Sequence, residues 1–154
     1  MLTNLTRIRN SVIAGLCGSV VHSLLALVHS KTGPLPEFQP NEDFQRVLSW
    51  LIGQDIHPSV AWLLLFVNGA VVWGLVFGQV YRYLPGKHPW QKGVFFGICV
   101  WIVMGLVFFP LVDRGIFAVA LGLGAAPAIL LLAMLLTYSV TMSLVYDFLN
   151  KVST

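Results

Sequence analysis

Four long apolar stretches occupy most of this 154-residue sequence, and they contain almost no charged side chains. They cover residues 11–28, 60–83, 93–112 and 128–149. A helix needs about 20 apolar residues to cross the hydrocarbon core of a bilayer, and each stretch reaches or nearly reaches that length. The sequence therefore predicts an all-α integral membrane four-helix bundle, in a single transmembrane domain over residues 1–154.

The overall composition argues against a soluble domain and against a nucleic-acid-binding protein. Charged residues make up 10% of the chain, whereas soluble domains carry about 25%. The net charge of +3 comes from basic residues that are spread over several loops rather than clustered. We therefore expect the lipid bilayer to be the principal partner of this chain, and we expect no nucleic acid.

Basic residues outside the apolar stretches predict the orientation of the chain. One side of the membrane would carry six of them and the other side three. The side with the excess of lysine and arginine is normally cytoplasmic, so both termini are expected in the cytoplasm. The six residues are Arg7, Arg9, Arg82, Lys87, Lys92 and Lys151, and the three are Lys31, Arg46 and Arg114.

The first extracytoplasmic loop contains a short amphipathic pattern. Phe44, Val47, Leu48 and Leu51 recur at i, i+3, i+4 and i+7, which places them on one face of a helix. The sequence predicts this helix over about residues 41–53. The helix is too short to span a bilayer, so we expect it on the outer membrane surface or across the end of the bundle.

The segment between the third and fourth stretches remains apolar where a polar loop is expected. Residues 116–126 are rich in glycine and follow Asp113 and Arg114, which we expect to form a local ion pair. Irregular apolar backbone at a membrane is tolerated only where protein covers it. Residues 113–127 are therefore expected either to re-enter the bundle or, as we prefer, to form a half-helix packed on its outer end.

Small residues recur at four-residue intervals in the apolar stretches, forming a narrow stripe on each. Small side chains let helix backbones approach closely, which is how helices associate in lipid. We expect the stripes and the amide of Asn68 to pack the four helices together, with dimerisation through one stripe as the alternative. The stripes comprise Gly15, Ser19 and Ser23; Ala70, Gly74 and Gly78; Gly93 and Gly97; and Ser139 and Ser143.

Candidate residues for chemistry are few. His22 is the only ionisable residue near the middle of an apolar stretch, and we interpret it as a hydrogen-bonding group or as a cofactor-binding residue. His29 lies about 10 Å further along the same helix, so one metal ion cannot bind both histidines. No aspartate or glutamate lies in the middle of an apolar stretch, and nothing in the sequence resembles a paired-carboxylate site or a nucleophile–base pair. We therefore predict no catalytic residue and no metal site.

Glycine and aromatic motifs in the last three stretches carry a family resemblance. The motifs are residues 62–77 (WLLLFVNGAVVWGLVF), 84–86 (LPG), 92–97 (KGVFFG), 109–111 (FPL) and the run from Gly115-Ile116-Phe117 to Pro127. They resemble an uncharacterised family of small four-helix bacterial inner-membrane proteins, a domain of unknown function. The resemblance implies a four-helix fold in the bacterial cytoplasmic membrane and brings no established activity. Family members often carry histidines at the positions of Leu65 and Leu135 in this sequence.

The loss of those two histidines favours a scaffolding role here. Together with the small-residue stripes and the lack of a reactive centre, it makes a non-catalytic accessory subunit of a larger respiratory or photosynthetic membrane complex our leading hypothesis. Other membrane-protein subunits would then be partners. One alternative is a small channel or carrier for a neutral solute. Another is a haem-, quinone- or carotenoid-binding protein with its ligand near His22. We expect no obligatory cofactor, although a bound lipid, quinone or carotenoid is compatible with the sequence.

Overall fold

The computed structural model describes residues 4–33 and 40–153, and 84% of it is helical, with no strand in those two ranges. Four helical segments are long and apolar enough to cross a membrane, namely Asn4–Thr32, Pro58–Val80, Pro89–Leu111 and Ala126–Val152. At 1.5 Å per residue they measure about 35 to 44 Å, which exceeds the roughly 30 Å of a hydrocarbon core. This composition and length indicate a multi-pass membrane protein.

Two of the four spans contain a π-helical interruption. The first span is α1 (Asn4–Thr32), and the short helix α2 (Pro40–Ile52) follows it. The second span consists of α3 (Pro58–Val67), the π-helical η1 (Asn68–Trp73) and α4 (Gly74–Val80). The third consists of α5 (Pro89–Val103), the π-helical η2 (Met104–Phe108) and α6 (Phe109–Leu111). The 3₁₀ helix η3 (Ile116–Leu121) leads to the last span, α7 (Ala126–Val152).

Prolines mark the beginnings of three spans. Pro58, Pro89 and Pro127 each occupy one of the first positions of a helix, where a residue without an N–H group leaves no hydrogen bond unmade. The start of α5 is also capped, because the Gln91 side-chain oxygen accepts the backbone N–H of His88 at 3.1 Å. The helices therefore begin at positions set by local chemistry, outside the limits of the apolar stretches.

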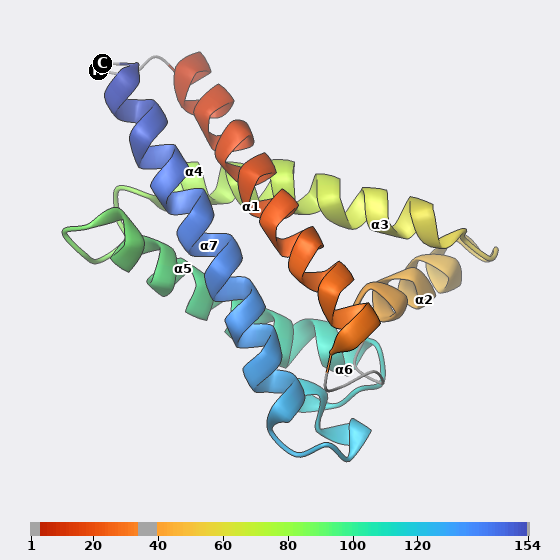
Figure 1. Cartoon of the computed structure of the whole chain (residues 1–154). Helices are drawn as coiled ribbons and strands as arrows, with labels where there is room; N and C mark the ends of the chain where they lie inside the picture. The colour runs from red at the N-terminus through yellow and green to blue at the C-terminus, as the bar shows by residue number, and fades with distance from the viewer. Residues whose placement is uncertain (1–3, 34–39, 154) are drawn as a thin grey trace.

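Helix α7 is the central element of the bundle. It packs against α1 along one side and against α5 along another, and α1 in turn packs against η1 and α4. Figure 1 shows the first turns of α1 and the last turns of α7 at one end of the bundle, which we call the terminal end. In the same view α3 diverges from α5 and α6 toward the opposite, outer end, where α2 packs against α3.

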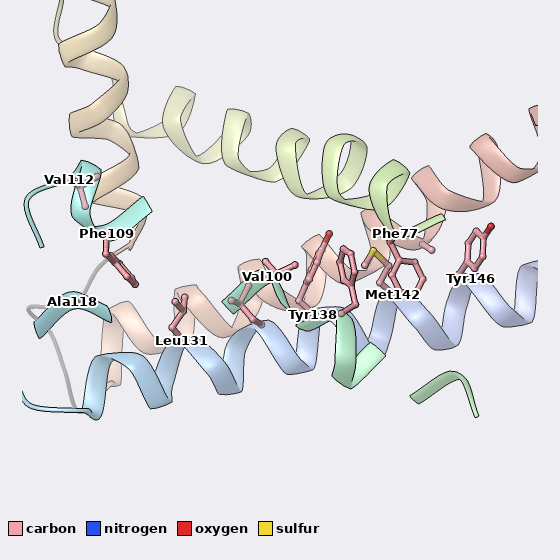
Figure 2. Close-up of a cluster of buried hydrophobic side chains, with 12 residues drawn as sticks. Phe77, Val100, Phe109, Val112, Ala118, Leu131, Tyr138, Met142 and Tyr146 are labelled. Atoms are coloured by element: carbon pink, nitrogen blue, oxygen red, sulfur yellow. The ribbon is translucent and has the colours of Figure 1, made fainter. Parts of the chain in front are cut away.

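Aromatic side chains join the second and third spans in the half of the bundle nearer the terminal end. The Phe77 ring on α4 is fully buried, and its centroid lies 5.0 Å from that of Phe96 on α5 and 5.7 Å from that of Tyr146 on α7. Edge-to-face pairs of this kind are favourable arrangements for aromatic rings. Figure 2 shows Phe77 beside Met142 and Tyr146, so the core here is filled by side chains.

The segment after α6 folds back onto the third span. Phe117 and Ala118 in η3 adopt positive φ angles of 52° and 61°, and the Phe117 ring occupies the space left by the missing side chain of Gly105. Its centroid lies 4.6 Å from that of Trp101, whose indole N–H donates to the carbonyl of Ala128 at 2.9 Å. This 3₁₀ turn thus caps the outer end of α5–α6 and leads into α7.

Candidate functional site

Close backbone contact between α1 and the second span positions the candidate site. A methyl group at Gly15 would overlap the carbonyl oxygen of Ala70, and one at Gly74 would lie 2.8 Å from the carbonyl oxygen of Ser11. At Gly78 a methyl group would overlap the Ser11 hydroxyl. The stripes of the first and second apolar stretches therefore face each other within the chain.

The third and fourth stretches meet in the same manner. A methyl group at Gly93 would lie 2.7 Å from the Val140 Cα atom, and one at Gly97 would lie 3.3 Å from the Ser139 Cβ atom. The Ser143 hydroxyl donates a hydrogen bond of 2.6 Å to the carbonyl of Pro89. Small residues thus bring α5 and α7 together.

A cavity of about 140 Å³ lies where α3 diverges from the third span. Its walls come from α1, α2, the second span, the third span and α7, and most of its lining is apolar or aromatic. The lining residues are Ser19, His22, Ser23, Ala26, Phe44, Trp62, Leu65, Phe66, Asn68, Gly69, Trp73, Val100, Met104, Phe108, Leu131, Leu135 and Tyr138.

Two polar atoms in the cavity wall are buried without a hydrogen-bond partner among the described residues. They are the Ser19 hydroxyl oxygen and His22 Nδ1. The His22 ring packs edge-on against Tyr138, with 6.2 Å between ring centroids. An unsatisfied polar atom in an apolar interior is costly. These two atoms are therefore the groups from which a ligand would gain most by forming a hydrogen bond.

The Tyr138 hydroxyl is occupied by the protein itself. It donates a hydrogen bond of 2.6 Å to the carbonyl of Gly69 in η1. A methyl group at Gly69 would lie 2.6 Å from the Ser19 hydroxyl oxygen, so glycine lets α1 and α7 approach this carbonyl together. Tyr138 is thus a wall of the cavity and a tie between α7 and the second span, and it is not a free donor.

Both π-helical segments contribute to the cavity wall. Asn68 and Trp73 belong to η1, and Met104 and Phe108 belong to η2. A π turn holds one extra residue, and such turns are found frequently at functional sites. The two irregular turns therefore lie at the level where the spans separate around the cavity.

Helix α2 covers the outer end of the cavity through Phe44. The neighbouring Asp43 side chain is 1% exposed and forms an ion pair with Arg114, with 2.8 Å between the arginine nitrogen and the carboxylate oxygen. The predicted local pair between Asp113 and Arg114 is therefore corrected, because the guanidinium of Arg114 turns to a carboxylate 71 residues away in sequence. This contact fastens α2 to the loop after α6.

The structure divides the residues singled out from the sequence into two groups. Gly15, Ala70, Gly74, Gly78, Gly93, Gly97, Ser139 and Ser143 lie at helix contacts inside the chain. Ser19, His22, Ser23 and Asn68 line the cavity, as do Leu65 and Leu135. The Asn68 backbone N–H donates to the carbonyls of Leu64 and Leu65 in its own helix, whereas its side chain forms no hydrogen bond with any residue in the described part of the chain and lines the cavity.

The aromatic walls of the cavity were not identified from the sequence. Trp62, Phe66 and Phe108 come from two spans, and nothing in their spacing distinguishes them from rings that face lipid. The one sequence feature that could have indicated these three rings is that they lie in the same spans as Asn68 and Gly105. Within residues 4–33 and 40–153 the structure contains no group of three His, Cys, Asp or Glu side chains that would hold a metal ion.

Comparison with other proteins adds a family and no activity. No curated protein matches the chain at a significant level, and neither does any solved structure. A family described as "Family of unknown function (DUF6789)" matches residues 5–154, almost the whole sequence. The chain therefore belongs to this family of unknown function, DUF6789.

Proposed function

We propose that this chain is a non-catalytic protein of the bacterial cytoplasmic membrane that binds a small, lipid-soluble ring compound bearing a polar oxygen, such as the head group of a quinone. The observation that supports this function is the cavity in which Ser19 Oγ and His22 Nδ1 are buried without partners. In this proposal the four apolar spans form a membrane bundle, α2 lies at its extracytoplasmic surface, and both termini are cytoplasmic.

The size of the cavity favours a single ring. Its volume of about 140 Å³ is close to that of an engineered protein cavity of about 150 Å³ that binds benzene. A porphyrin contains four pyrrole rings and is too large for this space. Of the three ligands considered from the sequence, the quinone head group therefore fits best.

The chemistry of the wall also favours a carbonyl or hydroxyl group on that ring. The Ser19 hydroxyl is able to donate a hydrogen bond to a ring carbonyl. The other ring nitrogen of His22 is engaged with the backbone of Met134, so Nδ1 of the neutral ring is an acceptor for a ring hydroxyl. The Asn68 amide lies on the same wall. Trp62, Trp73 and Phe108 supply aromatic faces for the ring to pack against.

Tryptophan fluorescence provides a direct test, because Trp62 and Trp73 line the cavity. A short-chain benzoquinone titrated into detergent-purified protein should quench this fluorescence with saturation. Replacing Ser19 by Ala and His22 by Leu should weaken binding about fivefold to tenfold for each hydrogen bond lost. Ser30→Ala is the matched control, because Ser30 is exposed and bonds only its own helix at Leu27.

Three results of this titration would reject the proposal. The first is equal affinity in the wild type and in the Ser19→Ala, His22→Leu variant. The second is an equal loss in the Ser30→Ala control. The third is equally tight binding of toluene, which has no oxygen and would reveal an apolar cavity without polar selectivity.

The accessory-subunit hypothesis is now supported less strongly than ligand binding. That hypothesis depended on stripes of small residues that would contact a partner protein. The glycines of those stripes instead contact helices of the same chain, namely Gly15, Gly74, Gly78, Gly93 and Gly97. Co-purification from native membranes in mild detergent remains its test. A neutral-solute channel is also less well supported, because the aromatic cluster fills the bundle on the terminal side of the cavity.

A further inference from the structure

A second cavity lies at the terminal end of the bundle, between the first turns of α1 and the last turns of α4. It measures about 280 Å³, and both polar and apolar side chains line it. We call it the Arg7 pocket. It is lined by Asn4, Arg7, Ile8, Ser11, Leu75, Gly78 and Gln79.

Arg7 differs from the other basic residues at this end of the bundle. Most of those have a partner within the chain: Arg9 with Asn10 and Ser153, Arg82 with Tyr83, Lys92 with Tyr81, and Lys151 with Asp147. Lys87 is exposed and lines neither cavity. The Arg7 guanidinium is half-buried beside a cavity and forms no ion pair with an acid in the described part of the chain.

The acids that the structure describes do not supply a counter-ion for Arg7. Asp147 is the acidic residue that the structure describes at the terminal end, and it is already bound to Tyr81 and Lys151. The other described acids lie in α2 and in the loops at the outer end. Among the described residues the Arg7 guanidinium thus has no acidic partner, which leaves it available to an external anion.

We infer that the Arg7 pocket binds the phosphate of an anionic phospholipid. Arginine matches the geometry of phosphate oxygens with paired N–H donors, and the side chains of Asn4 and Gln79 add further polar groups. Ile8 and Leu75 provide an apolar wall along which an acyl chain would lie. A free phosphate ion would use the polar groups only, so the mixed lining favours a lipid.

The length of α1 places this pocket at the level of lipid head groups. Its 29 residues measure about 44 Å, which exceeds a hydrocarbon core of roughly 30 Å by about nine residues. Arg7 lies in the first described turn of this helix. Basic pockets between spans at this depth are known to bind anionic lipid head groups.

Native mass spectrometry of the full chain in a neutral detergent tests this inference. Phosphatidylglycerol and phosphatidylcholine with identical acyl chains would be added to delipidated protein and the retained lipid counted. One arginine near a membrane surface corresponds to about a fivefold preference for the anionic lipid. The wild type and the matched control Lys87→Gln should show that preference, and Arg7→Gln should retain both lipids equally.

A second variant and a second ligand make the outcome decisive. Gln79→Leu keeps the positive charge of Arg7 but removes one polar group from the pocket wall, so it should reduce the preference for the anionic lipid. This variant supplies the test if circular dichroism shows that Arg7→Gln does not fold. The inference is overturned if both variants, where folded, keep the wild-type preference. It is also overturned if Lys87→Gln loses as much as Arg7→Gln, or if millimolar inorganic phosphate displaces the lipid.

Discussion

The hydroxyl of Tyr138 lies 2.6 Å from the carbonyl oxygen of Gly69 and donates a hydrogen bond to it. About two helical turns further along α7, the hydroxyl of Tyr146 approaches the carbonyl of Gly78 at the longer distance of 3.4 Å. Two tyrosines of one helix are therefore directed at two glycine carbonyls of the second span. The first contact is short and adjoins the cavity, and the second belongs to the aromatic cluster.

Tyr138→Phe should destabilise the bundle by about 1 kcal/mol, because it leaves the Gly69 carbonyl without this donor. Hydrogen bonds between membrane helices average about 0.6 kcal/mol, with a maximum near 1.7 kcal/mol, and a short bond belongs in the upper half of that range. The free energy of unfolding would be measured by titrating the detergent-solubilised protein with sodium dodecyl sulfate.

Tyr146→Phe provides the matched comparison, because it removes the same atom from the same helix. Its bond of 3.4 Å is near the geometric limit for a hydrogen bond, so the loss should be a few tenths of a kcal/mol at most. Equal losses in the two variants would show that the short bond to Gly69 has no special role.

Gly15→Ala should disrupt the contact between α1 and the second span. The added methyl group would overlap the backbone oxygen of Ala70, which cannot move without shifting a helix. Overpacking of this type costs about 1–3 kcal/mol. Gly97→Ala is the control, since its nearest neighbours are side-chain atoms of Leu136 and Ser139, each at 3.2 Å, rather than backbone atoms. In thermal unfolding in detergent, Gly15→Ala should lower the midpoint temperature more than Gly97→Ala does. The reverse order would contradict the predicted packing.

Arg114→Gln should loosen α2 from the rest of the protein. The Asp43 carboxylate would remain buried at 1% exposure without its main partner, and removing one member of a buried ion pair costs about 3–5 kcal/mol. We expect the lower end of this range, because the Arg114 side chain is 25% exposed. Amide hydrogen exchange in α2 should rise in parallel with the loss of stability.

The control for this variant is Arg46→Gln. Arg46 approaches the same carboxylate at 3.5 Å, but its side chain is 61% exposed, and exposed pairs contribute about 0–1 kcal/mol. Exchange in α2 that rises as much in Arg46→Gln as in Arg114→Gln would exclude the specific role assigned to Arg114.

Phe77→Ala should open a void in the aromatic cluster. Truncating a buried phenylalanine in a soluble core costs about 3–5 kcal/mol. Between membrane helices we expect about half of that, because lipid already solvates the ring in the separated state and only packing is lost. Phe148→Ala, at a position that is 64% exposed, should leave the unfolding free energy unchanged. A similar loss at both positions would be evidence against a packed cluster around Phe77.

The all-helical class and the four membrane-length helices were predictable from hydropathy, because each span is a continuous apolar run. The residues at which the spans begin and end were harder to predict from hydropathy. Residues 11–28 were expected in the first span, whereas α1 extends over Asn4–Thr32. Hydropathy detects the part of a helix that suits lipid, and polar turns such as Asn4–Asn10 continue the same helix without an apolar signal.

The candidate site was predictable only in part. His22 was identifiable because an ionisable residue in the middle of an apolar run is rare. Its neighbours Ser19 and Tyr138 are brought together by the way three helices cross, and a single sequence does not encode that crossing in any local pattern. The same holds for Arg114, whose adjacent residue Asp113 was the obvious partner in sequence while Asp43 is the partner in space.

The π turn at Asn68–Trp73 sets the two halves of the second span at different rotational phases. One additional residue in a helical turn corresponds to a rotation of about 100° for everything beyond it. With this offset, α4 presents Phe77 to the aromatic cluster while α3 presents Trp62 and Phe66 to the cavity. Deleting Val72, which is 52% exposed, would remove the offset and turn those two rings by about 100° relative to Phe77. The shape of the binding space thus depends on one surplus residue in the backbone as much as on the side chains around it.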